Sequence, residues 1–309
     1  MKLLDNSYIK YLLYNTMMFI RNNKLFRNIY LLLDDLGIRI FVSKLLNYRC
    51  NNKYSYNISK DMLEAKTFFK MNNSNVKKVV SLLKDEKSKK TYLQMIDFRG
   101  TFNNKSLPYI SYKKQYWDTD YFKYTNNEVM VDCGAYDGDS IRSFRKAMIK
   151  HRVFSFRIIA FEPDSDIYTY LISNYPNIKA FKSGVGEESE LKPFKNINYG
   201  GSYVVNEKEI EKNSNEVLQY IEVKKLDEVE ECQEATIIKM DIEGAEYEAL
   251  LGAEKLIKKN KPKLAICIYH KDEDFIRIPL LIHEWVPEYK LYVMQHSNTI
   301  YETVLYATI

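Results

Sequence analysis

The chain has 309 residues with 46% hydrophobic content, and its 46 basic residues are nearly balanced by 41 acidic ones, which gives a net charge of +5. This length and composition allow one large buried core and exclude a disordered or fibrous protein. Nucleic-acid-binding proteins usually carry a clear basic face, and a net charge this small gives no indication of one. We therefore expect no nucleic-acid partner.

The cysteines and the N-terminal segment indicate where the protein works. Cys50, Cys133, Cys232 and Cys267 have neither metal-ligand spacing nor the spacing of a disulfide framework, so we expect free thiols in the reducing cytoplasm. Polar residues interrupt the apolar residues of segment 1–24, which therefore contains no signal-peptide core and no span of about 20 apolar residues. No transmembrane segment is expected.

Residues 1–95 are predicted to be helical, because apolar residues recur at spacings of three and four, as in Val76, Val79, Val80 and Leu83. Residues 98–127 are rich in aromatic side chains and are interpreted as a connector that packs between elements rather than facing a ligand. We therefore divide the chain into a helical N-terminal region with its connector, 1–127, and a second domain, 128–309. A homo-oligomer formed through the N-terminal helices, or docking of a carrier protein there, stays open.

From residue 128 onward, short apolar runs alternate with amphipathic helical patterns. This alternation predicts a mostly parallel sheet with helices on both faces. The last two runs are separated only by 296–299 and are expected to pair antiparallel. The fold class is thus α/β, with a Rossmann-like seven-stranded sheet and a closing antiparallel hairpin, and its strands are predicted at 128–133, 156–162, 177–183, 236–241, 263–268, 290–295 and 300–307.

The first strand leads into the turn VDCGAYDG, which has two glycines, Gly134 and Gly138, among three aspartates. A dinucleotide site of the G-x-G-x-x-G type needs a third glycine, so a nicotinamide-dependent oxidoreductase is not favoured. Three carboxylates also suit a diphosphate poorly. They suit a ligand that offers an amine and ribose hydroxyls but no phosphate, and S-adenosylmethionine is such a ligand.

The second strand ends in AFEPDS, where Glu162 is placed to accept hydrogen bonds from ribose hydroxyls and Pro163 stiffens the turn. An acid that only favours a helix N-terminus is the alternative for Glu162. The residues at the end of the third strand are predicted to line one side of the adenine ring, and a plain turn is the alternative. The predicted donor site consists of Asp132, Gly134, Ala135, Tyr136, Gly138, Asp139, Ser140, Glu162, Pro163, Ser183, Gly184, Val185 and Asp241.

The segments VDCGAYDG, AFEP and IIKMDIEGAEYEALLGA together resemble the FkbM family of S-adenosylmethionine-dependent methyltransferases. The resemblance covers residues 128–307. It implies the class I methyltransferase sheet, S-adenosyl-L-methionine as cofactor, and an acceptor that is often a hydroxyl of a sugar or a natural product.

Two residues at the ends of later strands are the predicted catalytic groups. His270 is the candidate general base, because its intrinsic pKa lies near neutrality, and Asp241 ends the preceding strand. A structural histidine is the alternative reading for His270, and a helix cap is the alternative for Glu246. A cation held by Asp241, Glu243 and His270 is not required by the spacing, so no metal is predicted. The predicted substrate contacts are Ser202, Tyr203, Glu243, His270 and Lys271.

The predicted function is in-line transfer of a methyl group to a hydroxyl of a small-molecule sugar or a glycoconjugate. An amino group on a glycan-linked residue needs nearly the same donor site, so N-methylation is an alternative. A non-catalytic module that binds S-adenosylmethionine and an RNA methyltransferase are the two further alternatives.

Overall fold

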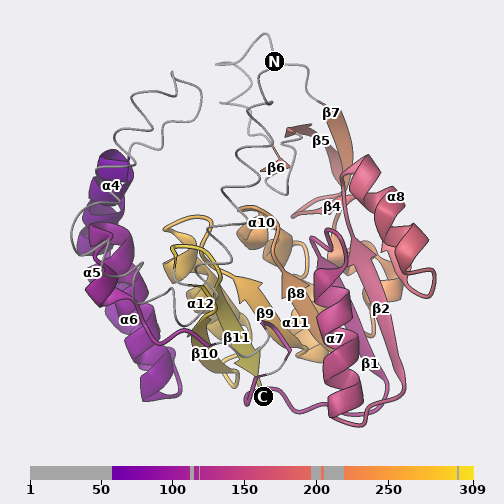
Figure 1. The fold of residues 1–309 in the computed structure, drawn as a ribbon, viewed down its shortest axis with the longest axis horizontal. Coiled ribbons are helices and arrows are strands. Elements are labelled where there is room, and N and C mark those ends of the chain that lie inside the picture. Colours follow the sequence, from indigo (N-terminus) through magenta and orange to yellow (C-terminus); the bar gives the residue numbers. More distant parts are fainter. Residues whose placement is uncertain (1–57, 112–114, 118, 196–202, 205–218, 298) are drawn as a thin grey trace, which may run out of the picture. The chain divides into compact units, whose positions relative to one another are not determined.

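The computed structural model describes residues 58–111, 115–117, 119–195, 203–204, 219–297 and 299–309 (Figure 1). The predicted helices before residue 58 and the predicted contact Ser202 lie outside these residues. The chain divides into two compact units, one made of Met1–Thr67 and Gln94–Leu107 and the other of Phe68–Leu93 and Pro108–Ile309. The boundary expected from the sequence, between 127 and 128, stays a prediction.

The described N-terminal residues are helical, as expected. The helices are α4 (Ile58–Met71), α5 (Asn73–Leu82) and α6 (Glu86–Thr101), followed by the short helix η1 (Asn104–Ser106). Within the first unit, Ser106 donates a hydrogen bond from its hydroxyl to Asp97, which ties η1 to the end of α6. Among the helices of the described residues, none is both long enough and apolar enough to cross a membrane.

The second unit contains a seven-stranded sheet with the order β10-β11-β9-β8-β1-β2-β3. Strands β3, β2, β1, β8 and β9 run parallel, and β11 runs antiparallel to both of its neighbours. The predicted seven-stranded sheet with a closing antiparallel hairpin is therefore confirmed. The strands are β1 (Glu128–Cys133), β2 (Phe156–Phe161), β3 (Lys179–Phe181), β8 (Ile237–Met240), β9 (Lys263–Cys267), β10 (Lys290–Gln295) and β11 (Thr303–Thr308).

Strand β1 is central, and the strand order reverses beside it. From β1 the chain proceeds outward through β2 and β3 on one side, and later through β8 and β9 on the other. Ligands of open α/β sheets bind outside the carboxyl ends of the strands at such a reversal. The carboxyl ends of β1 and β8 are paired neighbours, so the turns that follow them lie together.

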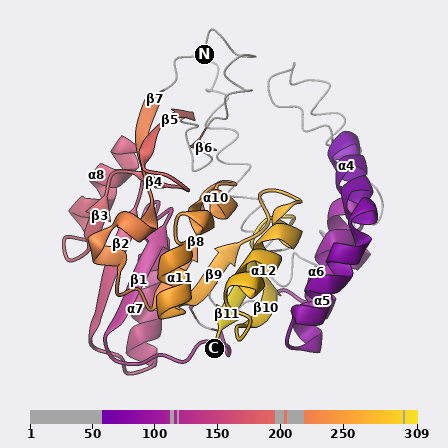
Figure 2. The ribbon, with the colours of Figure 1, turned by 180° about the vertical axis from the view of Figure 1, so that it is seen from behind.

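Helices cover both faces of this sheet. Helix α7 (Asp139–Lys150) lies on the face seen in Figure 1, and α11 (Glu254–Asn260) and α12 (Asp274–Trp285) lie on the face seen in Figure 2. The apolar stripe of α7, formed by Ile141, Phe144 and Met148, is buried. It packs in a core with the connector, where the Trp117 ring meets the Phe144 ring edge-on at 5.3 Å. Trp117 of the connector is thus part of this core.

The open edge of the sheet at β10 is partly covered by other segments of the same unit. The backbone N–H of Lys84 donates to the Leu291 carbonyl, and that of Ser111 donates to the Gln295 carbonyl, both at 2.9 Å. Tyr92 donates its hydroxyl hydrogen to the Phe275 carbonyl of α12 at 2.9 Å. Residues 68–93 and 108–111 therefore block an edge strand that would otherwise offer its unpaired backbone groups to another chain.

A second, four-stranded sheet was not predicted. It has the order β4-β7-β5-β6 and consists of β4 (Gly184–Val185), β5 (Glu190–Lys195), β6 (Tyr203–Val204) and β7 (Gln219–Lys224). The strand predicted at 177–183 ends at Phe181 in the structure, and residues 184–185 pair with β7 instead. Phe194, Ile221 and Val223 form a small core of their own, which explains why this segment separates from the main sheet.

Candidate functional site

The glycine turn after β1 contains two left-handed residues, each required for a different reason. Gly134 has φ +80, and a Cβ atom there would lie 2.0 Å from the main-chain oxygen of Asp241. Gly138 has φ +81, and a Cβ there would lie 2.3 Å from the ring of Tyr175. The sequence interpretation gave Gly138 a close approach to a ligand, whereas the structure puts a packed tyrosine at that place. Gly134 is the glycine that brings the ends of β1 and β8 together.

Beneath this turn lies a buried ion pair. The Asp132 carboxylate and the Lys239 ammonium are 3.2 Å apart, and their side chains are 0% and 3% exposed. They occupy directly paired positions on β1 and β8. Burial raises the pKa of Asp132. Burial alone would lower the pKa of Lys239, but Asp132 and Asp241 outweigh it and raise that pKa, so the ammonium is charged at neutral pH.

The Lys239–Asp132 pair also fixes the turn itself. The Lys239 ammonium donates to the Gly134 carbonyl at 2.7 Å, and the Ser140 hydroxyl at the start of α7 donates to the Asp132 carboxylate. Asp132 and Ser140 were both predicted to bind the donor. In the structure they bond to each other below the turn, and together with Lys239 they hold the backbone on which a ligand would rest.

Glu162, directly after β2, has the environment expected of a ribose-binding acid. Its side chain is 6% exposed, and its two carboxylate oxygens accept the backbone N–H groups of Tyr136 at 3.0 Å and Asp164 at 2.9 Å. Each oxygen keeps a second acceptor position. Burial raises the pKa of Glu162 to about 7. The carboxylate is therefore held in one orientation and gains from any further donor.

The other residues predicted to bind the donor differ in exposure, and two of them belong to the second sheet. Tyr136 follows Gly134 and is 41% exposed, with φ 44, and Asp139 is exposed at the first position of α7. Ala135 and Ser183 are buried, and Pro163 is half-buried behind Glu162. Gly184 and Val185 belong to the second sheet, through β4. The structure thus brings the residues of the β1 and β2 ends together, and the adenine-wall role of Ser183, Gly184 and Val185 stays a prediction.

These residues fit S-adenosylmethionine. Glu162 would accept the ribose hydroxyls, and the turn around Gly134 and Tyr136 would lie against the rest of the ligand. The turn offers carboxylates, which are unsuited to a phosphate but compatible with a cationic amine and sulfonium.

The raised pKa of Glu162 predicts that donor binding depends on pH. A ribose hydroxyl hydrogen bond favours the ionised carboxylate, whereas the free protein binds a proton below a pKa of about 7. Binding below this pH must therefore expel that proton, so affinity rises with pH and levels off above it. We expect the affinity for S-adenosylhomocysteine to increase roughly tenfold between about pH 6 and about pH 8, measured by calorimetric titration. Glu162→Gln should bind weakly and with no such slope, and a slope that persists in this variant would contradict the assignment.

The carboxyl end of β8 presents Asp241, which two tyrosines hold in place. Tyr116 and Tyr269 each donate a hydroxyl hydrogen to its carboxylate at 2.8 Å. Burial by itself raises the pKa of Asp241, but Lys239, His270 and the two tyrosine hydrogen bonds outweigh burial and lower it. Asp241 is therefore ionised at neutral pH, and its catalytic role stays a prediction.

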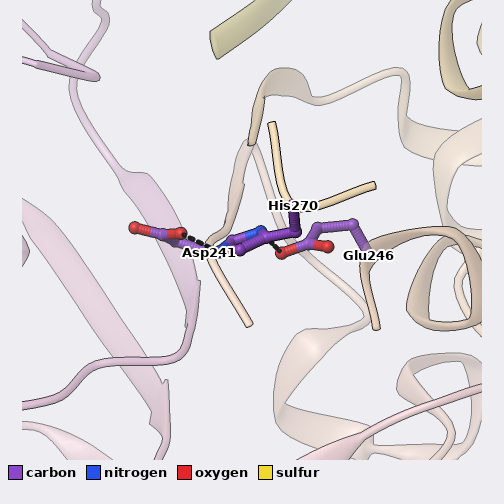
Figure 3. A group of neighbouring side chains, drawn as sticks. All are labelled: Asp241, Glu246 and His270. Atoms are coloured by element: carbon purple, nitrogen blue, oxygen red, sulfur yellow. Dashed lines mark ion pairs between the residues drawn. The ribbon is translucent and has the colours of Figure 1, made fainter. Parts of the chain in front are cut away.

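His270, after β9, lies between carboxylates (Figure 3). Its Nδ1 atom is 2.9 Å from Glu246 Oε1, and its Nε2 atom is 3.7 Å from Asp241 Oδ1 and 3.5 Å from Glu243 Oε2. Burial alone would lower the pKa of His270, but Glu246, Asp241 and Glu243 raise it to about 9. The carboxylates therefore favour a positive charge at this position.

Two further acids face the same place. Burial raises the pKa of Glu243, whose side chain is 40% exposed, to about 7. Burial and Asp241 raise the pKa of Glu302, the residue before β11, to about 7 as well. Glu243, Glu302, Tyr116 and Tyr136 are all non-glycine residues with positive φ, between 44 and 70. Backbone strain of this kind is typical of functional sites.

Several site residues were not predicted from the sequence. Lys239 reads as an ordinary strand residue, and only its pairing with Asp132 reveals its place. Tyr116 comes from the connector, and Tyr269 and Glu302 lie in segments that fit the end of the predicted sheet but were given no role of their own. Glu246 was given a capping role as one alternative; it does accept the Ile242 N–H at 2.8 Å, but it also meets His270. Of the predicted substrate contacts, Glu243, His270 and Lys271 lie at the ends of β8 and β9, whereas the Tyr203 side chain lies outside the description.

The family model and the similar crystal structure both identify the same domain, methyltransferase FkbM. Residues 132–294 match the model of the methyltransferase FkbM domain. The crystal structure of methyltransferase FkbM from Methylobacillus flagellatus KT is similar, with a TM-score of 0.63 and 24% identity over 78% of this chain and 60% of that chain. A SAM-dependent methyltransferase from Aquifex aeolicus has a TM-score of 0.35 and 12% identity over 60% of this chain and 84% of that one. None of the curated proteins compared with the sequence matches it.

Proposed function

The chain belongs to the FkbM family of S-adenosylmethionine-dependent methyltransferases, and we propose that it methylates a hydroxyl of a sugar or glycoconjugate. S-adenosyl-L-methionine is the methyl donor. The chain spans 60% of the FkbM structure to which it is similar, so the acceptor is a proposal based on this chain's own site.

The observation that carries the proposal is the group of carboxylates at the ends of β8 and β9. Asp241, Glu243, Glu246 and Glu302 gather there around His270. Such a site repels phosphorylated or otherwise anionic groups and accepts a neutral hydroxyl or a cation. This charge supports a sugar hydroxyl over RNA, and it leaves an amino group as the second candidate acceptor.

The chemistry requires alignment of the acceptor oxygen with the donor methyl group and removal of the hydroxyl proton. When bound, S-adenosylmethionine supplies an electrophilic methyl group on a sulfonium. We propose that Asp241, which is ionised at neutral pH, accepts the proton, because His270, the base candidate from the sequence, has a pKa of about 9 and is itself mostly protonated at that pH. Tyr116 and Tyr269 hold the Asp241 carboxylate in place, so this carboxylate is oriented before the acceptor binds.

Methyl transfer to a panel of acceptors tests the proposal. Purified protein is incubated with S-adenosylmethionine that carries a labelled methyl group, and with neutral sugars, amino sugars, glycoconjugates and RNA in parallel. We expect label in a hydroxyl-bearing carbohydrate. Transfer only to amines would establish the alternative acceptor, and donor binding without transfer to any of them would favour a non-catalytic binding module.

The role of Asp241 is tested on the acceptor that this panel identifies. Asp241→Asn keeps the shape of the side chain but removes its charge, so kcat should fall at least about 100-fold while S-adenosylhomocysteine still binds. Glu248→Gln, which changes a carboxylate of α10 (Glu246–Leu251) that faces Arg277 instead of His270, is the matched control and should keep its activity. Equal activity of Asp241→Asn and Glu248→Gln would reject the role.

The cysteines support the proposed cytoplasmic location. Cys133, Cys232 and Cys267 are buried free thiols. Proteins of oxidising compartments more often carry disulfides.

A further inference from the structure

Asp241, Glu246 and His270 come from three different segments and present their ligand atoms to one another. Asp241 follows β8, Glu246 begins α10, and His270 follows β9. One nitrogen or oxygen of each lies within 4.8 Å of the others, and Figure 3 shows the imidazole ring between the two carboxylates. We propose that these three side chains bind a divalent cation, with Glu246 in the place of Glu243, which had been considered from the sequence.

Their hydrogen bonding is the first independent argument. The His270 side chain is 9% exposed, yet neither ring nitrogen makes a hydrogen bond of acceptable geometry within the described residues, although carboxylate oxygens lie near both. Glu246 is 0% exposed, and its Oε2 atom likewise lacks a hydrogen-bond donor there. Leaving buried polar atoms without hydrogen bonds costs free energy, and a cation would supply a partner for one ring nitrogen and for a Glu246 oxygen.

Geometry is the second argument. A small divalent cation lies about 2.0 to 2.2 Å from its nitrogen and oxygen ligands, so two ligands of one ion are at most about 4.4 Å apart. The separation of 3.7 Å between His270 Nε2 and Asp241 Oδ1 is within that limit and too long for a hydrogen bond. One ion would use a single ring nitrogen of His270, and because the three ligand atoms lie within 4.8 Å of one another, the side chains would have to draw together slightly when the ion binds.

The surrounding contacts orient the proposed ligands. Asp241 receives the hydroxyl hydrogens of Tyr116 and Tyr269, and Glu246 receives the Ile242 N–H. Metal ligands are usually fixed by such outer hydrogen bonds. Two carboxylates and one imidazole form a set suited to Mn²⁺ or a similar divalent ion. Three protein ligands also leave coordination positions open for a substrate, as in catalytic sites.

The role of the ion rests on the proposed function, whereas its binding does not. An acceptor hydroxyl bound to the ion would lose its proton more readily. Its oxygen would then form a bond to the methyl carbon as the carbon–sulfur bond breaks and leaves a neutral thioether, and the proton would pass to Glu243 or to water. Asp241 and His270 would thus promote proton loss as ligands of the ion.

Calorimetric titration with Mn²⁺ alone, on protein treated with a chelator and dialysed, tests the site. We expect saturable binding of one ion per chain, weakened at least about tenfold in Asp241→Asn, Glu246→Gln and His270→Gln. Glu248→Gln should bind Mn²⁺ as the wild type does, because its carboxylate lies on the same helix but outside the cluster. Titrations with Mg²⁺ and Zn²⁺ identify the preferred ion.

Titration with S-adenosylhomocysteine, run on every variant, shows which proposal fails. Absence of saturable Mn²⁺ binding in a wild type that still binds S-adenosylhomocysteine would overturn the cation site and leave the methyltransferase assignment intact. Mn²⁺ binding that is unchanged in all three cluster variants would also overturn it, because the ion would then bind elsewhere. Mn²⁺ binding without any binding of S-adenosylhomocysteine would count against the proposed function alone.

Discussion

Lys239→Met should destabilise the protein by about 3 to 5 kcal/mol, because it leaves the Asp132 carboxylate buried without its ion-pair partner. Asp132 is 0% exposed, and Ser140 would be its one remaining hydrogen-bond donor among the described side chains. The substitution also removes the donor to the Gly134 carbonyl. Urea denaturation, monitored by circular dichroism, measures the loss.

The pH dependence of this variant follows from the same carboxyl. Burial already raises the pKa of Asp132 in the presence of the ammonium, and loss of the ammonium raises it further. An acid with a raised folded-state pKa destabilises the fold when it is ionised, so the stability deficit should shrink only as the pH falls through that pKa towards the lower pKa of the unfolded chain. The double variant Lys239→Met, Asp132→Asn should recover part of the loss even at neutral pH.

A surface ion pair provides the control. Lys258 and Glu254 lie one turn apart on α11, 2.5 Å from each other, and both are more than 40% exposed. Lys258→Met should cost less than about 0.5 kcal/mol. A loss in Lys239→Met as small as that in Lys258→Met would show that the buried pair does not hold the turn.

The sequence was most informative where apolar strands and turn residues coincide. Strands β1 and β10 have the predicted bounds, and the hairpin of β10 and β11 pairs as predicted. The small second sheet was missed because its strands β4 and β6 have only two residues each, and because β5 and β7, with six residues each, bury only one and two of them. Short strands depend on pairing partners elsewhere in the chain, which periodicity does not reveal.

The candidate site was predictable only in part for a similar reason. Asp241, His270 and Glu162 follow apolar strands, and parallel strands bring their carboxyl ends to one edge of a sheet. The pairing of Lys239 with Asp132 depends on the register between β1 and β8, which no local pattern gives. The contact of Glu246 with His270 depends on how α10 begins relative to the loop after β9. Motifs thus indicate which strand ends matter, whereas partners across the site require the fold.

Gly134→Ala should be more damaging than any other glycine substitution near the site, with a loss of about 4 kcal/mol or more and no donor binding. Alanine is strained at φ +80, and its Cβ would lie 2.0 Å from the Asp241 carbonyl oxygen, which is backbone and has little freedom to move. Relief of this clash would push the end of β8 away from the turn. The substitution therefore displaces Asp241 at the same time as it distorts the donor turn.

Alanine substitutions at two other glycines show how much of the effect comes from backbone strain and how much from the clash with Asp241. Gly138→Ala meets the Tyr175 ring, a side chain that can rotate, and should cost less than Gly134→Ala although its φ is also positive. Gly184→Ala meets only the side chains of Ile221 and Val223, at 3.3 and 3.6 Å, and should change stability by less than about 1 kcal/mol. Thermal unfolding and S-adenosylhomocysteine titration of the three variants should therefore rank them in this order. A Gly134→Ala protein that binds the ligand as well as Gly184→Ala does would show that close contact between the β1 turn and the end of β8 is not needed for donor binding.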